Sequence, residues 1–390
     1  MVTEQKPGID YTAIATELAP IIKDNSDRIN SERQIPSDIA QDLADRGFFR
    51  LLLPKTLGGA EIEHSQFLDI LEIIAESDTS TAWCLNQNNV WSTSATRMPE
   101  KTAKEIWKDQ RAVVTNGPPS AACKAIPVED GYALTGRWNF SSGCTHATWI
   151  AALSPVATPD GSSLVSGDRK DMKILLIPKE QVEFVDTWDA QGMRGTSSFG
   201  FELNNLFVPS NHTYDQDEAD PWNNGPLYVI PRTLLFAAGF STVALATANA
   251  SIKIAVDFAS GGHSGRNQAM LRDQGTTQRS IGEAQAIYGA SRAYLRESMS
   301  LVWASASQKG VITLEERLAL RLASTYAIRT AANVVDICYN LCGSGAIFSS
   351  NPIQRRFQDI HVITQHLQGH PTNYEYAGQF LLGLEPEGNF

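Results

Sequence analysis

The stretch Gly136-Arg137-Trp138-Asn139-Phe140-Ser141-Ser142-Gly143 organises this chain. It opens on a turn residue and continues with an aromatic–polar alternation, which is typical of a half-buried strand. It ends in two hydroxyls and a glycine, so small donors and bare backbone amides are expected at the rim of a sheet, where Gly143 lets a ligand approach closely. Taken alone, Ser-Ser-Gly after a strand is more often a plain turn. The rest of the chain has to decide between a turn and a binding site.

The composition is that of an ordinary soluble globular protein. The chain has 390 residues, of which 42% are hydrophobic and 19% charged, and this length predicts two or three packed regions. A formal net charge of −11 without any basic run argues against nucleic acid and against an anionic membrane surface as partners. No apolar run approaches the ~20 residues that span a bilayer, and residues 1–30 lack the pattern of a signal peptide.

Cysteine and histidine usage indicates a cytoplasmic protein without a metal site. The 5 cysteines are scattered and include no Cys-x-x-Cys, which favours reduced thiols. His366 and His370 have the i, i+4 spacing of zinc ligands on a helix, but no cysteine accompanies them. Pro371 follows directly and makes an uninterrupted helix there doubtful.

The predicted elements are helical, then β, then helical again. Apolar spacing predicts helices through about the first 110 residues, the first of them kinked or split at Pro20. β-Branched and aromatic residues between turn signals then predict an antiparallel sheet or small barrel rather than an alternating β-α pattern. Long apolar and amphipathic stretches begin at Arg232. We expect an α-helical domain at residues 1–112, a β-domain at 113–228 and a helical bundle at 229–390.

This order resembles the acyl-CoA dehydrogenase fold, which is an α+β fold with an N-terminal α-helical domain, a middle antiparallel β-domain and a C-terminal four-helix bundle. More narrowly, the chain is similar to the oxygenase components of two-component flavin-dependent monooxygenases, such as those acting on 4-hydroxyphenylacetate, secosteroid phenols and dibenzothiophene. The resemblance covers nearly the whole chain. The matching motifs are Ser80-Thr81-Ala82-Trp83, Gly136 to Gly143 with His146-Ala147-Thr148-Trp149, Gly192-Met193-Arg194-Gly195-Thr196-Ser197-Ser198, Val208-Pro209, Arg355 to Asp359, and Asn373-Tyr374-Glu375 with Gly378 and Leu382-Gly383-Leu384.

One position separates the two branches of this fold. Acyl-CoA dehydrogenases usually carry their glutamate base a short way after an Arg-Asp pair, although some members carry it elsewhere. Here no glutamate occurs between Asp359 and Gly369, and His366 stands in that segment, as a histidine does in the monooxygenases. An imidazole can both accept and donate a proton near pH 7.

The resemblance implies an enzyme in which reduced FMN or FAD reacts with O2 to form a C4a-hydroperoxyflavin. This species hydroxylates an aromatic or heteroatom-containing small molecule. The chain has no Gly-x-Gly-x-x-Gly in a βαβ unit, so NAD(P)H is expected to act through a separate flavin reductase. A homotetramer is also implied. The alternatives are an acyl-CoA dehydrogenase-like desaturase with an unusual base and a non-catalytic flavin- or acyl-chain-binding protein.

The resemblance also assigns cofactor contacts. Ser142 corresponds to the serine at flavin N5, with Ser141 as the alternative because successive strand residues face opposite sides. For these serines and for the aromatic and amide residues named next, a role in packing or in a turn remains an open alternative. The other expected contacts are Phe140 and Trp188 against the isoalloxazine, Asn116 at its pyrimidine, and Arg266, or Arg272, at its phosphate.

The expected substrate-binding residues are Asn89, Trp91 and His366, with His366 and Ser142 as the catalytic residues. Relatives that hydroxylate phenols often place a histidine on the helix that follows Trp83. The segment from Asn86 to Ser92 contains none. This departure favours a neutral aromatic or heteroatom substrate held by amides and Trp91, while core packing is the alternative for Asn89 and Trp91.

Overall fold

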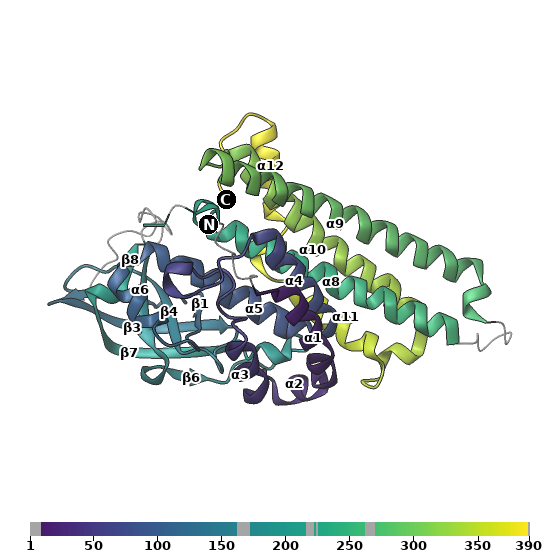
Figure 1. Cartoon of the computed structure of the whole chain (residues 1–390), viewed down its shortest axis with the longest axis horizontal. Coiled ribbons are helices and arrows are strands. Elements are labelled where there is room, and N and C mark those ends of the chain that lie inside the picture. The colour runs from purple at the N-terminus through teal and green to yellow at the C-terminus, as the bar shows by residue number, and fades with distance from the viewer. Residues whose placement is uncertain (1–8, 162–171, 216–221, 224, 262–269, 389–390) are drawn as a thin grey trace, which may run out of the picture.

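The structure is a computed structural model that describes residues 9–161, 172–215, 222–223, 225–261 and 270–388. A β-rich end, the N-terminal helices beside it and a set of long helices that extends away from both make up the molecule (Figure 1). This is the predicted order of an α-helical part, a largely antiparallel β part and a helical bundle. The exact division at residues 112 and 228 stays a prediction.

The N-terminal part is helical. Its first helix begins where the Asp10 carboxylate accepts the backbone N–H groups of Thr12 and Ala13, which no residue of the helix itself can bond. The elements are α1 (Tyr11–Asp24), α2 (Ser26–Glu32), α3 (Ser37–Asp45), η1 (Lys55–Leu57), α4 (His64–Ser77), α5 (Thr79–Ser92), η2 (Thr93–Arg97) and α6 (Glu100–Trp107).

Helix α1 runs through Pro20, where we expected a kink or a split. The break comes after Asp24 instead, and α2 follows it. A proline inside a helix costs roughly 3 kcal/mol. The helical path buries Leu18 and Ile22 in the core, each worth about 1.5–3 kcal/mol, so the helix continues.

The middle part consists of two four-stranded sheets, ordered β1-β4-β5-β8 and β2-β3-β7-β6. The pairings between these strands are antiparallel with one exception, since β1 runs parallel to β4. Parallel strands need a crossover connection, and the chain from β1 to β4 passes through β2 and β3. Trp138 joins the sheets: it stacks on Phe201 of β7 at 5.0 Å and donates to the Leu153 carbonyl of β4 at 2.8 Å. The strands are β1 (Val114–Gly117), β2 (Lys124–Val128), β3 (Gly131–Ser141), β4 (Trp149–Pro155), β5 (Met172–Pro178), β6 (Glu183–Val185), β7 (Phe199–Pro209) and β8 (Thr213–Asp215), with η4 (Lys179–Gln181), η5 (Arg194–Thr196) and η6 (Ser210–His212) between them.

The C-terminal part is a bundle in which α8, α9, α10 and α11 pack on one another (Figure 1). Helix α10 begins with a capping box, in which Thr313 and Glu316 satisfy each other's backbone N–H. The elements are α7 (Pro226–Val229), α8 (Arg232–Gly261), η7 (Leu271–Asp273), α9 (Gly275–Lys309), α10 (Leu314–Leu341), η8 (Gly343–Ile347), α11 (Pro352–Ile363), η9 (Leu367–Gly369) and α12 (Thr372–Leu381).

Helix α8 is the one helix in the described ranges that is long and apolar enough to cross a membrane. Its most apolar window is 89% buried within the protein, where α4, α5, α9, α10 and α11 pack against it. An apolar helix covered in this way is the centre of a core.

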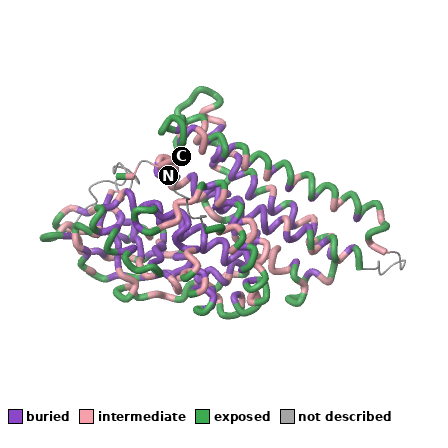
Figure 2. Tube along the Cα trace, in the orientation of Figure 1, coloured by how far each residue is buried: buried purple, intermediate pink, exposed green. Residues whose placement is uncertain are grey.

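Helix α5 lies at the junction of the three parts. All of its residues, from Thr79 to Ser92, are buried, and buried residues concentrate between the β part and the bundle (Figure 2). It packs closely on α8, where Gly239 faces Asn86: a Cβ on Gly239 would overlap the Asn86 side-chain amide. The absence of a side chain at Gly239 therefore sets the spacing of these two helices.

We expect Gly239→Ala to destabilise the protein by about 1–3 kcal/mol, since the added methyl forces α5 and α8 apart in a packed core. The measurement is the midpoint of chemical unfolding. The matched control is Gly289→Ala in the middle of α9, where a Cβ meets nothing within 4 Å. That change should stabilise by up to ~1 kcal/mol through helix propensity. Equal effects of the two substitutions would show that Gly239 is not a close-packing position.

Candidate active site

The sequence 136–143 forms the end of β3 and the turn after it. The pairing of β3 with β7 shifts register between Trp138 and Ser141, and Phe140 adopts a left-handed backbone conformation with φ of 55°. Such a φ is uncommon for a bulky residue and concentrates at functional sites. As a result Phe140 is 61% exposed, whereas Ser141 and Ser142 both point into the protein. The alternation expected of a regular strand is broken here.

Ser142 belongs to a chain of hydroxyl groups. Its Oγ accepts the indole N–H of Trp83 at 3.2 Å and shares a hydrogen bond of 2.8 Å with Ser198 Oγ. Thr196 Oγ1 continues the chain at 2.6 Å from Ser198 Oγ. From β1, Thr115 donates to the Ser142 carbonyl at 2.6 Å. The position of the Ser142 hydroxyl is therefore fixed from α5 and from the segment after η5.

Trp83 is the side chain where the two predicted catalytic residues meet. Its ring stacks on Phe240 of α8, with centroids 3.7 Å apart and planes at 21°. The His366 ring stands edge-on to both, at 5.1 Å from Trp83 and 4.9 Å from Phe240. Ser142 and His366 thus contact one indole from different parts of the fold, one from the β part and one from the bundle.

His366 is a neutral imidazole in this environment. Burial, together with the positive charge of Arg321, lowers the pKa of His366 to about 4. Its Nδ1 accepts the backbone N–H of Gln368 at 3.3 Å. A neutral ring that accepts at Nδ1 carries its proton on Nε2, so His366 presents an N–H donor near pH 7.

Arg321 places its charge close to His366 from α10. The side chain is buried and donates to Gln368 Oε1 and, at 2.7 Å, to Thr233 Oγ1 at the start of α8. Gln368 also donates to the Thr233 carbonyl at 3.3 Å, and Thr325 donates to the Gln368 carbonyl at 3.0 Å. These bonds hold the 366–369 segment against α8 and α10.

Asp359 anchors the 192–198 segment to the bundle. Its Oδ1 accepts the Met193 backbone N–H at 2.6 Å, and Gly192 lies so close to α11 that a Cβ would overlap the Gln358 backbone. Burial raises the pKa of Asp359 to about 6. The segment in turn bonds β3, since the Gly143 N–H donates to the Thr196 carbonyl at 2.7 Å. Asp359 served in the sequence only as a landmark, and this supporting role was missed.

Phe140 and Trp188, both expected beside a flavin ring, lie next to each other. Their centroids are 6.1 Å apart at an interplanar angle of 85°, and the Trp188 indole donates to the Met193 carbonyl at 3.0 Å. Nearby, Ser141 Oγ is buried and has no hydrogen-bond partner among the described residues. An exposed Phe140 ring beside the partly buried Trp188 ring, a strained backbone and an unused hydroxyl are features that a planar cofactor with polar edges can use, so these residues fit a flavin.

Asn116 on β1 is held by two short hydrogen bonds. Gln87 Nε2 and Trp91 Nε1 both donate to its Oδ1 at 2.6 Å. An indole nitrogen only donates, so the amide of Asn116 has to turn its oxygen toward α5 and its NH2 group away from it. Asn116 thereby offers a donor, the group that a flavin or substrate carbonyl accepts.

The remaining predicted residues do not join this cluster. The Asn89 amide is used entirely by the protein: it accepts from the Leu51 and Leu52 N–H groups and donates to the Phe48 and Leu85 carbonyls. Its assignment to the substrate stays a prediction that these contacts do not support. Arg266 lies outside the described residues. Arg272 is exposed, 3.9 Å from Asp273. No cluster of three or more potential metal ligands occurs in the part of the chain that is described.

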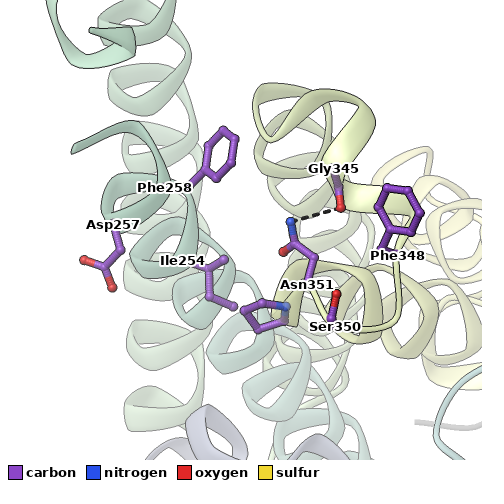
Figure 3. Close-up of a pocket in the computed structure, with 8 residues that line it drawn as sticks. Ile254, Asp257, Phe258, Gly345, Phe348, Ser350 and Asn351 are labelled. Carbon is purple, nitrogen blue, oxygen red and sulfur yellow. Dashed lines mark hydrogen bonds between the residues drawn. The ribbon is translucent and has the colours of Figure 1, made fainter. Parts of the chain in front are cut away.

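A separate hollow of about 450 Å³ lies between the C-terminal part of α8 and the segment around Gly345 and Asn351 (Figure 3). Ile254 and Phe258 line it from α8. It is some 14 residues, or about 21 Å along the helix axis, from the level of Phe240. This hollow is therefore not part of the Trp83–His366 cluster.

Two family models match the chain. The model "Acyl-CoA dehydrogenase, N-terminal domain" matches residues 12–108, and "Acyl-CoA dehydrogenase, C-terminal domain" matches residues 238–371. Together they cover more than half of the chain, at both ends of the fold described above. The protein belongs to the acyl-CoA dehydrogenase family.

Individual relatives fall in one branch of that family. The chain is 26% identical over 383 residues to an indole-3-acetate monooxygenase of Acinetobacter baumannii, an alignment that covers 98% of this chain and 96% of the relative. It is 24% identical over 397 residues to the oxygenase subunit of a Mycobacterium tuberculosis flavin-dependent monooxygenase, covering 98% of each. The fold matches the structure of XiaF from Streptomyces, solved with FADH2 and glycerol, with a TM-score of 0.88, 21% identity and 97% coverage of both chains.

The low pKa of His366 makes a pH-dependent contribution to stability. The unfolded ring takes up a proton below about pH 6.5, while the folded ring stays neutral down to about pH 4, so this contribution is full above pH 6.5 and is lost as the pH falls toward 4. Between pH 7.5 and 4.5 the free energy of unfolding of the natural protein should therefore fall. In His366→Gln we expect that fall to be smaller by on the order of 2 kcal/mol, as measured by denaturant unfolding across this pH range. Burial also lowers the pKa values of His64 and His146 to about 3, so these two residues keep the remaining pH dependence of stability in the variant.

Gln365→Ala is the control for this measurement, because it changes an exposed neighbour of His366 and removes no titrating group. Its pH profile should match that of the natural protein. An unchanged profile in His366→Gln would contradict a neutral His366 in the folded protein.

Proposed function

We propose that this protein is the oxygenase component of a two-component flavin-dependent monooxygenase. It uses reduced FMN or FAD and O2 to hydroxylate an aromatic or heteroatom-containing small molecule. The observation that carries the proposal is the meeting of Ser142 and His366 at Trp83. Within the described ranges, no carboxylate is hydrogen-bonded to any of these three side chains, so the proton abstraction of a dehydrogenase has no base among them.

The proposed cofactor contacts are the residues that fit a flavin. Phe140 and Trp188 flank the ring, Ser141 and Ser142 supply hydroxyls at its edge, and Asn116 supplies an amide NH2. Arg266 is proposed for the phosphate on the basis of its charge alone. When bound, reduced flavin supplies the electrons and the oxygen activation that hydroxylation needs.

The chain's own residues prepare the place of reaction. The stacked Trp83 and Phe240 form an apolar wall that excludes water, which strengthens every electrostatic contact beside it. His366 stands edge-on to that wall and stays uncharged, with its proton on Nε2. Ser142 holds Trp83 in place and keeps a small hydroxyl, rather than a bulky group, at the edge where oxygen has to enter. Trp91 and Asn116 extend the same face toward the substrate.

The reducing partner is proposed to be a separate NAD(P)H-dependent flavin reductase. The sequence lacks the glycine-rich βαβ fingerprint of a nicotinamide site, and the M. tuberculosis relative is named as an oxygenase subunit. Five buried cysteines with no disulfide among the described residues agree with a cytoplasmic location.

We propose a homotetramer built through the bundle. Large apolar side chains are exposed on its surface. They are Phe348, which lines the hollow of Figure 3, its neighbour Ile347, and Leu381, Leu382 and Leu384 at and just after the end of α12. Patches of this kind mark contact surfaces. Sedimentation velocity tests the proposal, and a monomer at micromolar concentration would count against it.

The activity is tested by mixing the protein with photochemically reduced flavin and then with O2. We expect an oxygen-dependent absorbance band in the near ultraviolet that decays more slowly than with free flavin, and O2 consumption linked to product when an aromatic substrate is added. Reduction of oxidised flavin by an acyl-CoA without O2 would instead indicate a desaturase. Tight flavin binding without either reaction would indicate a binding protein.

Ser142→Ala sharpens this test. The change removes the hydroxyl from the cofactor edge and leaves the Trp83 N–H without its acceptor, which costs about 1–3 kcal/mol of stability. We expect a shorter-lived near-ultraviolet band and more H2O2 per O2 consumed. Ser154→Ala is the control, because among the described residues that buried hydroxyl on β4 bonds only the neighbouring Pro155 carbonyl. If both variants keep the natural lifetime, Ser142 has no role at the cofactor.

A further inference from the structure

The side chains of Ser142, Ser198 and Thr196 form a continuous row of hydrogen bonds, which we call the hydroxyl chain. It begins at the Trp83 indole, whose nitrogen lies 3.2 Å from Ser142 Oγ. It continues over 2.8 Å to Ser198 Oγ and over a further 2.6 Å to Thr196 Oγ1. It ends at the Met193 carbonyl, 2.8 Å from Thr196 Oγ1. The three hydroxyl residues are each at most 6% exposed, so bulk water does not compete for these bonds.

The two ends of the hydroxyl chain determine the direction of every hydrogen bond in it. An indole nitrogen only donates and a carbonyl oxygen only accepts, whereas each hydroxyl has a single hydrogen to donate. The Thr196 hydrogen goes to the Met193 carbonyl, so the Ser198 hydrogen goes to Thr196. The Ser142 hydrogen then goes to Ser198, while Ser142 accepts from Trp83. In this direction every contact of the chain is a hydrogen bond.

The opposite direction is less stable in the folded protein. If Thr196 donated to Ser198 and Ser198 donated to Ser142, the bond to the Met193 carbonyl would be lost. The Ser142 hydrogen would also have no acceptor among the described residues, and a buried hydrogen without an acceptor is unfavourable. Ser142 therefore gives its hydrogen to the protein. Of its two lone pairs the Trp83 indole uses one, and the other is left for a ligand.

The acceptor at the end of the hydroxyl chain is fixed by contacts from outside the chain. Asp359 of α11 accepts the Met193 N–H at 2.6 Å, and the Trp188 indole donates to the Met193 carbonyl at 3.0 Å. The Gly143 N–H donates to the Thr196 carbonyl at 2.7 Å, which ties the turn after β3 to the same segment. The direction of the chain is thus set by the fold before any ligand binds.

We propose that Ser198 and Thr196 are positioning residues that make Ser142 a hydrogen-bond acceptor toward the cofactor. This assignment rests on the proposed function, which places the Ser142 hydroxyl at the edge of a flavin, and it takes N5 as the atom at that edge. Reduced flavin carries a hydrogen on N5, whereas oxidised flavin has only a lone pair there. An acceptor at Ser142 pairs with the first and opposes the second. The hydroxyl chain therefore contributes to selecting the redox state of the bound flavin.

Thr196→Val tests this direction, because it removes the hydroxyl and nearly keeps the shape of the side chain. Without an acceptor at position 196, Ser198 donates to Ser142, and the Ser142 hydrogen is released toward the cofactor. The measured quantity is the ratio of the dissociation constants of oxidised and reduced FMN, obtained by anaerobic calorimetry on the full chain. We expect Thr196→Val to lower this ratio by about tenfold or more. Thr196→Ser keeps a hydroxyl and should hold the ratio within about twofold.

Ser198→Ala is a second variant, which keeps the test available if Thr196→Val does not fold. It removes the acceptor of the Ser142 hydrogen and should lower the same ratio. Thr145→Val is the matched control, because Thr145 Oγ1 shares a hydrogen bond of 3.0 Å with Ser197 Oγ. It therefore removes a hydroxyl contact between the same two segments but outside the hydroxyl chain. Its ratio should stay within about twofold of the natural value.

5-Deaza-FMN separates the contact at N5 from the other differences between the two redox states. In this analogue a C–H group replaces N5 of the oxidised ring, so the opposing lone pair is absent while the shape is nearly the same. The natural protein should bind the analogue about tenfold more tightly than oxidised FMN. Thr196→Val should lose or reverse that preference, because its Ser142 hydrogen pairs with the N5 lone pair.

The proposal is overturned if folded Thr196→Val and Ser198→Ala keep the natural ratio, or if Thr145→Val lowers it as much as they do. It is also overturned if the natural protein does not prefer 5-deaza-FMN to oxidised FMN. A protein that binds no flavin refutes both this assignment and the proposed function. Because binding is measured without O2, the expected shifts without oxygen chemistry refute the proposed function alone, and oxygen chemistry with an unchanged ratio refutes only this assignment.

Discussion

Four consecutive amides, Asn86-Gln87-Asn88-Asn89, lie in the middle of a helix that is buried on every side, and the architecture depends on how they are satisfied. They reach three places in the fold. Asn86 donates to the Phe236 carbonyl of α8, and Asn89 donates to the Phe48 carbonyl before η1. Gln87 and Asn88 both donate to β1, to the Asn116 side chain and the Val114 carbonyl. A buried amide left without partners costs about 1–3 kcal/mol. These hydrogen bonds therefore fix the rotation of helix α5 about its axis and its position relative to the three parts of the fold that pack on it.

That constraint explains why the candidate site lies where it does. Once the amides fix the rotation of α5, Trp83 and Trp91 are directed into the contact with α8, and Gly239 lets the two helices approach closely enough for Trp83 to stack on Phe240. Ser142 then meets Trp83 from the β part, and His366 meets it from the bundle. The site needs all three parts of the chain because its central side chain belongs to the helix that joins them.

The sequence predicted the structure best where the residue types of a short segment are enough to determine its secondary structure or its chemistry. The change from helical to β-rich sequence and back predicted the order of the elements. The glycine, serine and histidine motifs singled out Ser142 and His366, whose catalytic roles stay predictions and whose side chains both contact Trp83. Local patterns failed where distant contacts take over. Phe140 leaves the strand alternation because a register shift turns its backbone left-handed. Asn89 looked like a ligand-binding amide because three of its four backbone partners lie far away in the sequence. Phe240 had no local signal, and Asp359 was noted only as part of a motif, since the roles of both arise from packing between elements.

The charged side chains near the site are arginines, and they favour one kind of chemistry there. Burial, together with the charge of Arg321, keeps His366 neutral, and the Arg232 guanidinium lies over Trp91 on the same helix as Trp83. No described carboxylate is hydrogen-bonded to His366 or Ser142. In a region from which the stacked aromatic rings exclude water, such positive charges act over longer distances than they do at a surface. A group that gains negative charge beside the Nε2 proton of His366 is stabilised there, whereas loss of a proton to His366 is opposed by Arg321. The same side chains that disfavour a general base thus favour a donor, and this is the electrostatic reason for placing the protein among the oxygenases of its family rather than among the dehydrogenases.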